Sequence, residues 1–326
     1  MTFAGSPDHV ESRLVPEAGF ELDTFAVSGL PRRVGVDLAR ALARAVRAPF
    51  ACSRILARRR PDVVLGAGGY VAGPMVLAAR VRGIPAALTE ADAHLGLANR
   101  LAAPFARRVF LAYAIPGRDG ARYTVVGRPI PRAHLGASGF AARSHFGLPL
   151  DVPVLAVFGG LAGAQALNDL AADAWGASGP AVLHVSGERD HDFVQARVHR
   201  PDYVLVPSTD HFGEALAAAS LALSRAGGTV WELAAAGTPA ILVPYPHATA
   251  NHQALNARHF AEGGGAVVVD QAELARVPAL VEELLGDAAR LERMSAAMRT
   301  LARPGAADEV ADELIALAGA RHREAA

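Results

Sequence analysis

Two glycine-rich turns in the second half of the chain have the composition of phosphate-binding loops. The first, residues 158–164, reads Phe-Gly-Gly-Leu-Ala-Gly-Ala and lies between an apolar run and a helical pattern. The second, residues 224–232, has the same setting and adds the hydroxyl of Thr229. Glycines let the backbone approach a phosphate closely, and the amides at a helix N-terminus attract the anion. One such turn is often no more than a tight turn, but two in succession predict a site for a nucleotide diphosphate.

Polar side chains follow these turns at positions that suit a nucleotide sugar. Glu232 comes about one helical turn after the second glycine pair and could accept hydrogen bonds from a ribose diol. The helix dipole alone also favours a glutamate in a first turn. Residues 251–256 open a further helical pattern with Asn, His and Gln, and amides can both donate to and accept from sugar hydroxyls. Ordinary N-capping by Asn251 is the simpler reading of that segment.

A third glycine turn, residues 66–74, joins a strand to a helix in the first half of the chain. Its amides could hold a second ligand that carries a phosphate. The next predicted strand ends in the polar segment 89–94, where Glu90, Asp92 and His94 are candidates for a general base. Loop polarity and a helix cap at Asp92 would explain the same residues without catalysis.

Short apolar runs alternate with longer helical patterns along most of the chain, which is typical of parallel sheets covered by helices. The pattern predicts an α/β protein of two Rossmann-like domains, residues 1–130 and 131–326, whose strand ends face a cleft. Helical spacing continues from about residue 277 to residue 321. The predicted strands are 61–66, 84–88, 109–112 and 123–126 in the first domain and 154–158, 181–185, 204–206, 221–223 and 240–243 in the second.

Composition limits the classes of partner. The 32 basic and 32 acidic residues balance, so no net field favours nucleic acid. A single cysteine, Cys52, excludes a disulfide framework and fits a reducing cytosol. No apolar run is long enough for a membrane-spanning helix. We therefore expect a cytosolic protein, and segment 32–60, which is apolar and rich in arginine, is a candidate surface for an anionic bilayer. An amphipathic helix packed on the sheet would have the same pattern.

Taken together, these segments resemble the MurG family, glycosyltransferase family 28. Residues 64–100 are similar to the family stretch G-x-G-G-Y-V-S-G-P followed by H-E-Q-N-A-x-x-G-x-x-N-R. The turn at Gly159 is similar to the family's G-G-S-Q-G-A, and residues 225–256 resemble its donor motif, which ends in D-x-Q-x-x-N-A. The resemblance extends over nearly the whole chain.

The resemblance implies a GT-B fold and inverting transfer of N-acetylglucosamine from UDP-N-acetylglucosamine to lipid I, which forms lipid II in peptidoglycan synthesis. It implies no cofactor or metal, and a peripheral location at the cytoplasmic face of the cell membrane. Two alternatives remain open. One is a GT-B transferase with another UDP-sugar or lipid acceptor, and the other is a homologue that binds a nucleotide sugar without turnover.

The resemblance also assigns roles by position. The donor diphosphate would be held by the turn from Gly160 to Ala164 and by Thr229. Glu232 would bind the ribose, His252 and Gln253 the sugar, and Arg132 the uracil side. The acceptor pyrophosphate would face the turn at Gly68. The donor residues implied are Gly160, Gly163, Ala164, Arg225, Gly228, Thr229, Glu232, His252, Gln253, Asn256 and Arg132, and the acceptor residues are Gly68, Gly69, Tyr70 and Asn99.

The sequence departs from the family pattern at four places. The family opens with a strand and a G-G-T-G-G-H loop, whereas residues 1–5 look like its second strand. We therefore expect Met1 to be an internal codon, with that loop encoded upstream, because a missing central strand would leave buried edges unpaired. Segment 89–93 reads T-E-A-D-A, Leu161 and Ala162 replace S-Q, and the arginine assigned to the uracil side is displaced by one residue.

Overall fold

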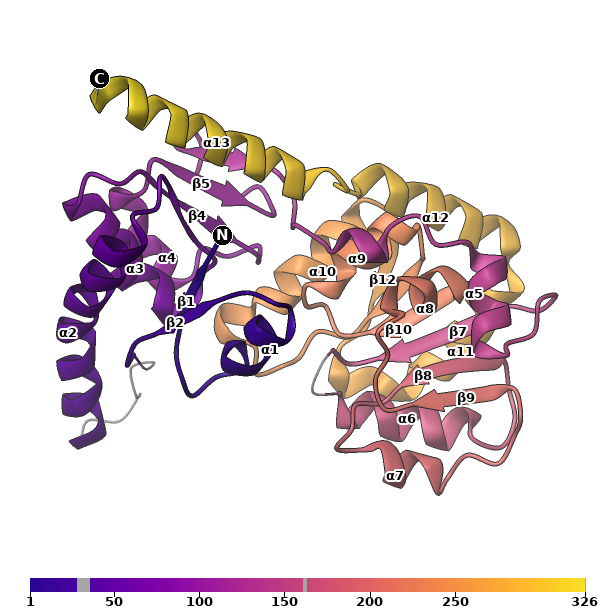
Figure 1. Ribbon diagram of the computed structural model, residues 1–326. Helices are drawn as coiled ribbons and strands as arrows, with labels where there is room; N and C mark the ends of the chain where they lie inside the picture. Colours follow the sequence, from indigo (N-terminus) through magenta and orange to yellow (C-terminus); the bar gives the residue numbers. More distant parts are fainter. Residues whose placement is uncertain (28–35, 161–162, 326) are drawn as a thin grey trace. The chain divides into compact units, whose positions relative to one another are not determined.

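The computed structural model describes residues 1–27, 36–160 and 163–325 (Figure 1). The chain forms two compact units, residues 1–126 with 308–326, and residues 127–307. Each unit contains parallel β-sheet with helices packed on it, as the alternation of patterns predicts.

The first unit holds a two-stranded sheet and a four-stranded sheet, ordered β1-β2 and β3-β4-β5-β6. Every strand pair in them is parallel. Arg59 on α2 donates through Nε to Asp23 on β2 at 2.7 Å, which ties the smaller sheet to a helix of the same unit. The strands are β1 Phe3–Gly5, β2 Leu22–Thr24, β3 Val64–Gly66, β4 Ala86–Glu90, β5 Arg108–Leu111 and β6 Tyr123–Val125. The helices are α1 Glu11–Glu17, α2 Val36–Arg59, α3 Gly69–Val81, α4 Leu97–Ala102, η1 Ala103–Phe105 and α13 Ala306–Ala325.

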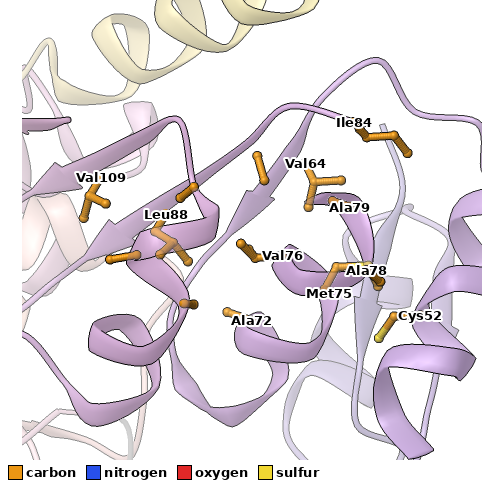
Figure 2. Close-up of a cluster of buried hydrophobic side chains, with 14 of the residues drawn as sticks. Cys52, Val64, Ala72, Met75, Val76, Ala78, Ala79, Ile84, Leu88 and Val109 are labelled. Atoms are coloured by element: carbon orange, nitrogen blue, oxygen red, sulfur yellow. The ribbon is translucent and has the colours of Figure 1, made fainter. Parts of the chain in front are cut away.

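The core of the first unit forms where α3 covers β3 and β4. Figure 2 shows Val76 and Leu88 pointing toward one another, with Cys52 of α2 on the far side of α3. All three side chains are buried. Burial raises the pKa of the Cys52 thiol to about 12, so this cysteine is an inert packing residue.

The second unit has one six-stranded parallel sheet, ordered β12-β11-β10-β7-β8-β9. Its four central strands are almost completely buried, as expected for a sheet with helices on both faces. The strands are β7 Val154–Phe158, β8 Ala181–Val185, β9 Tyr203–Val206, β10 Leu221–Ser224, β11 Ala240–Leu242 and β12 Ala266–Val268. The helices are η2 Arg132–His134, α5 Gly139–Phe146, α6 Gln165–Trp175, α7 His191–Gln195, α8 Phe212–Ala218, α9 Thr229–Ala236, η3 Thr249–Asn251, α10 His252–Glu262, η4 Gln271–Arg276, α11 Val277–Gly286 and α12 Ala288–Leu301.

The strand order of the second unit creates a topological switch point. From β7 the chain adds β8 and β9 on one side, and it then returns to add β10, β11 and β12 on the other. β7 and β10 are neighbours in the sheet, and the loops that leave them run in opposite directions along it. In open α/β sheets, ligands bind in the crevice at the carboxyl ends of such strands.

The structure differs from the predicted domains at the C-terminal end of the chain. The predicted boundary at residue 130 lies four residues beyond the observed end of the first segment, and the prediction placed all C-terminal helices in the second domain. Helix α13 instead packs on the first unit, because Val310 joins a buried cluster with Ala87 and Phe110. Arg321 also donates to the carbonyl of Pro61 at 2.8 Å. Helical periodicity shows that a face is apolar but not which sheet it covers.

Candidate functional site

A cavity of about 550 Å³ lies at the carboxyl edge of the six-stranded sheet. This volume is within the usual range for small-molecule sites. Its walls come from the turns after β7, β8, β10, β11 and β12 and from the starts of α6 and α10, so it occupies the switch point. The lining residues are Gly159, Gly163, Ala164, Gln165, Ala166, Asp169, Arg189, Arg225, Tyr245, Gln253 and Gln271.

The turn between β7 and α6 requires glycine at two positions for steric reasons. A Cβ atom on Gly159 would lie 2.3 Å from the amide nitrogen of Ala164. A Cβ atom on Gly163 would lie 2.2 Å from the carbonyl oxygen of Ser186, and its φ of +71° is also unfavourable for other residues. The close approach brings the N-terminus of α6, an 11-residue helix, to the cavity wall. Leu161 and Ala162, where the sequence departs from the family, lie outside the described residues.

A buried polar network fixes this turn to β8. Asn168 on α6 donates through Nδ2 to the carbonyl of Ser186 and to Asp190, each at 2.9 Å. Its Oδ1 lies 2.9 Å from Nε2 of His184, whose Nδ1 lies 2.7 Å from the hydroxyl of Tyr203. Because Asn168 Oδ1 can only accept, Nε2 of His184 carries the proton and its Nδ1 accepts from the hydroxyl. Burial lowers the pKa of His184 to about 3, so the ring is neutral.

Arg225 is the central cation of the cavity. It follows β10 directly, and its guanidinium donates to the carbonyls of Val243 and Pro244 and, at 2.6 Å, to Gln271. The ring of Tyr245 lies 5.5 Å from the guanidinium carbon. Burial lowers the pKa of Arg225 from its ordinary value, yet an arginine remains protonated at any physiological pH. A fixed positive charge here would stabilise a bound anion.

The second glycine turn leads into α9, where Thr229 is the first helical residue and is partly buried. A Cβ atom on Gly228 would lie 2.2 Å from the guanidinium carbon of Arg128, so glycine lets that side chain cover the turn. One turn along, Oε1 of Glu232 lies 2.6 Å from Nδ1 of His134. The histidine therefore orients the carboxylate, and the sequence prediction had not included it.

Helix α10 supplies the remaining donor candidates, but they play different parts. Gln253 lines the cavity, and its Oε1 accepts from the amide of Tyr245 at 2.9 Å. His252 forms a hydrogen bond within its own segment, with Nδ1 2.9 Å from the carbonyl oxygen of Thr249. Asn256 is fully buried and donates to the carbonyl of Ala226 at 3.1 Å, so it supports the second glycine turn from behind. Asn251 has a left-handed backbone and makes no side-chain cap, so the simple capping interpretation of this segment is wrong.

The structure thus groups only part of the predicted donor set around the cavity. Gly163, Ala164, Arg225 and Gln253 line it. Gly160 belongs to the same turn with a φ of +85°. Gly160 itself is not a lining residue, and neither are five other predicted residues: Gly228, Thr229, Glu232, His252 and Asn256. Arg132, on η2, is exposed and does not line the cavity either.

In the first unit, two glycines with positive φ mark the start of the 13-residue helix α3, which follows β3. Gly68 has φ of +92° and Gly69 has φ of +66°. Tyr70, in the first turn of α3, contacts His9 through a hydrogen bond between its hydroxyl and Nε2 of the ring. Burial, followed by the nearby charge of Glu11, raises the pKa of Tyr70. The tyrosine is therefore a neutral hydrogen-bonding group beside the helix N-terminus.

Glu90 has a well-defined role in shaping the loop that follows β4. It is 9% exposed, and its Oε2 accepts at 2.9 Å from both the amide of Gly96 and Nδ2 of Asn99. The same Nδ2 donates to the carbonyl of Thr89 at 2.9 Å. Asn99 Oδ1 is buried and has no hydrogen-bond partner among the described residues. Asp92 and His94 are partly exposed in this loop.

Sequence reasoning missed several residues of the cavity and of the network behind it. In the cavity these are Arg189, Tyr245 and Gln271, which stand in loops far apart along the chain. Only Tyr245, between two prolines directly after a predicted strand, carried a local signal. The buried network also went unnoticed, although His184 within the apolar run Ala-Val-Leu-His-Val is an unusual residue for a central strand.

Comparison with known proteins identifies the family. The model of the glycosyltransferase family 28 C-terminal domain matches residues 154–310, and that of the N-terminal domain matches residues 2–111. A relative from Mycobacterium sp. (strain KMS), named UDP-N-acetylglucosamine–N-acetylmuramyl-(pentapeptide) pyrophosphoryl-undecaprenol N-acetylglucosamine transferase, is 43% identical over 91% of this chain and 82% of its own. The relative of the same name from Rubrobacter xylanophilus is 39% identical over 97% of this chain and 95% of its own.

Solved structures agree with this result. MurG of Acinetobacter baumannii superposes with a TM-score of 0.77 at 28% identity, covering 96% of this chain and 90% of that one. The calicheamicin glycosyltransferase CalG4 has a TM-score of 0.66 at 20% identity, with 98% and 90% covered, and it supports the fold alone. The predicted GT-B fold is thereby confirmed. The chain belongs to glycosyltransferase family 28, and it is a GT-B glycosyltransferase similar over most of its length to MurG proteins.

Proposed function

We propose that this protein transfers N-acetylglucosamine from UDP-N-acetylglucosamine to lipid I, with inversion at the anomeric carbon, in peptidoglycan synthesis. The observation that carries the proposal is the cavity at the β7/β10 switch point, which combines a glycine turn, a helix N-terminus and the partly buried cation Arg225. These groups suit the diphosphate of a nucleotide sugar. The family membership and the names of the relatives support the choice of sugar and acceptor.

The diphosphate would lie against the amides of Gly160, Gly163 and Ala164 and the side chain of Arg225, with the hydroxyl of Thr229 as a further donor. Glu232 would accept from the ribose diol through the oxygen that His134 does not hold. Gln253 would contact the sugar, because its Oε1 already accepts from the chain and its amide nitrogen is the group that remains to donate. As UDP departs it gains negative charge, which Arg225 and the α6 N-terminus would stabilise.

Donor binding provides a direct check of the role of Glu232. Glu232→Ala is expected to weaken UDP binding by about 1–3 kcal/mol, the usual loss when a buried polar partner is removed. Isothermal titration with UDP and with 2′-deoxy-UDP measures this change. The loss should be smaller for the deoxy ligand, because one of the two hydroxyls that the carboxylate would bind is already missing. Equal affinity of wild type and variant for UDP would refute the ribose role.

The chemical step requires a base on the acceptor side. The base removes the proton of the acceptor hydroxyl, the hydroxyl oxygen bonds to the anomeric carbon, and the bond from that carbon to the UDP oxygen breaks with its electron pair. Both oxygens of Glu90 face amide groups of its own loop, with the amide of Asp92 at 3.4 Å from Oε1. We therefore assign Glu90 to positioning and keep Asp92 and His94 as candidate bases. Comparison of kcat for Asp92→Asn and His94→Gln distinguishes them.

The acceptor pyrophosphate would bind at the amides of Gly68 and Gly69, at the N-terminus of α3. Tyr70, neutral at physiological pH, would donate from its hydroxyl. Asn99 adds a buried carbonyl oxygen that lacks a partner among the described residues and therefore suits a hydroxyl or amide donor of the acceptor. Its side chain is next to the turn, since Nδ2 would lie 3.7 Å from a Cβ atom on Gly68.

A lipid-linked acceptor requires contact with a membrane, and no described helix has the length and apolar content to cross one. Part of the proposed membrane segment, residues 32–35, lies outside the described residues. The described part of α2 presents Val46 and Phe50, 68% and 71% exposed, beside the exposed Arg47. On α4, Leu101 is 65% exposed and follows the exposed Arg100. Apolar side chains next to arginines suit an anionic bilayer surface, so we propose a peripheral location at the cytoplasmic face.

Flotation with liposomes tests this surface. We expect the protein to float with vesicles that contain anionic lipid and to stay in solution with zwitterionic vesicles. Phe50→Ser combined with Leu101→Ser should reduce the bound fraction several-fold, because two membrane anchors are lost. Ile315→Ser on α13, at a site that is 70% exposed, is the matched control and should bind as the wild type does. Binding that is independent of lipid charge and of both variants would end this proposal.

A further inference from the structure

Three side chains of the second unit form a cluster with the composition of a metal site. His145 is on α5, His211 immediately precedes α8, and Glu214 is in the first turn of α8. One ligand atom from each lies within 4.8 Å of the others. Nδ1 of His145 is 3.0 Å from Oε2 of Glu214, and Nδ1 of His211 is 2.9 Å from Oε1. None of the three residues lines the cavity described above.

The elements that carry these residues are held together independently of the cluster. Arg143 of α5 donates to the carbonyl of Ala218, at the end of α8, and to the hydroxyl of Ser220, each at 2.9 Å. A Cβ atom on Gly139 would lie 2.8 Å from the carbonyl of Ala217, so glycine permits close approach of the two helices. The ligand side chains therefore meet because the backbones are fixed. Such preorganisation lowers the entropic cost of binding a cation.

The distances match those of a coordination sphere. Zinc binds imidazole nitrogen and carboxylate oxygen at about 2.0–2.2 Å, which places neighbouring ligand atoms about 3–3.5 Å apart. The two nitrogen-to-oxygen separations are already close to this range. The two imidazole rings have centroids 4.4 Å apart, and each ring offers one nitrogen to the same group of ligand atoms. Two imidazoles and one carboxylate favour zinc-like cations over magnesium or calcium, which prefer oxygen ligands.

We propose that His145, His211 and Glu214 form a binding site for a divalent transition-metal ion of the zinc class, with the remaining coordination positions filled by water. All three side chains are at least one-third exposed, so an ion has access from solvent. The ion joins α5 to the start of α8, and it replaces the two hydrogen bonds to Glu214 with metal bonds. This site is separate from the proposed glycosyl transfer and does not depend on it.

A calorimetric titration of tag-free protein with Zn²⁺ as the only added metal tests the site. We expect one equivalent of Zn²⁺ to bind, and the thermal midpoint of unfolding to rise with it. His145→Ala, His211→Ala and Glu214→Gln should each weaken Zn²⁺ binding at least about tenfold, since even outer partners of metal ligands commonly matter that much. With Co²⁺ as a coloured probe, d–d absorption bands should be present in the wild type and lost in the variants.

His191→Ala is the matched control. His191 also lies beside a carboxylate, with Nδ1 3.3 Å from Asp192, but this pair belongs to no three-ligand group among the described residues. This variant should bind Zn²⁺ as the wild type does. The proposal is overturned if the wild type binds no Zn²⁺, or if the three cluster variants bind it with unchanged stoichiometry and affinity. In either case the three residues form only a hydrogen-bonded cluster.

Discussion

Replacing Gly163 with alanine is expected to destabilise the second unit by about 2–5 kcal/mol and to weaken UDP binding by at least about tenfold. Two effects combine at this position. The backbone has φ of +71°, which other residues adopt only at a cost. The new methyl group would also lie 2.2 Å from the carbonyl oxygen of Ser186, so the turn between β7 and α6 must move. Denaturant unfolding and calorimetric titration with UDP measure the two losses.

Gly160→Ala is the matched control within the same turn. Gly160 has φ of +85°, but a Cβ atom there would lie within 4 Å of no atom of the described residues other than its chain neighbours. It should therefore show only the backbone cost, about 1–2 kcal/mol. Equal destabilisation by the two substitutions would contradict the steric account, because the contact with Ser186 would then contribute nothing. Both tryptophans of the chain, Trp175 and Trp231, are in the second unit, so tryptophan fluorescence reports the unfolding of this unit alone.

Acidification is expected to destabilise the second unit because of His184. Its pKa is lowered from 6.5 to about 3 in the folded state, so the unfolded chain binds a proton that the folded chain excludes. The resulting stability is complete above pH 6.5 and is lost progressively as the pH falls from 6.5 toward 3. One such group changes the free energy of unfolding by about 1.4 kcal/mol per pH unit within that window. Denaturant midpoints followed by tryptophan fluorescence at several pH values measure the slope.

His184→Gln should remove much of this dependence. Glutamine can still donate to Asn168 Oδ1, but it does not titrate, so the variant should lose less stability on acidification. Near pH 7 the variant should be less stable than the wild type. Burial also lowers the pKa of His259, which therefore contributes to the same pH range. His259→Gln is thus a useful comparison, and it should reduce the slope less. An unchanged slope in His184→Gln would show that the buried network does not couple to protons.

Sequence reasoning was most successful where a single local pattern determined the outcome. The apolar runs at 154–158 and 181–185 are the strands β7 and β8 with the same bounds, because buried parallel strands have continuous apolar sequences. The glycine turn at 158–164 lies where a strand-to-helix turn was predicted. By contrast, the short strands β2 and β12 were not predicted.

The rest of the site depends on strand order and on the partners of each polar group. Arg189, Tyr245 and Gln271 share one cavity because β8, β11 and β12 end at the same sheet edge, and spacing along the chain does not reveal this. Glu90 was predicted as a candidate base from its place at a strand end. The position was right, but only the structure shows that its oxygens accept from its own loop and from Asn99. Likewise, the helical pattern around Asn168 does not show whether this side chain faces solvent. The structure places it in the buried network.

The measurement that tests the central claim most directly is transfer of labelled N-acetylglucosamine from UDP-N-acetylglucosamine to lipid I by the purified protein. The account predicts a labelled lipid product that requires both substrates, and UDP-glucose should replace the donor poorly. Titration with UDP in the same preparation shows whether the donor cavity is intact. If UDP binds and no label reaches lipid I, the proposed acceptor and activity are contradicted, while the donor site in the second unit would stand.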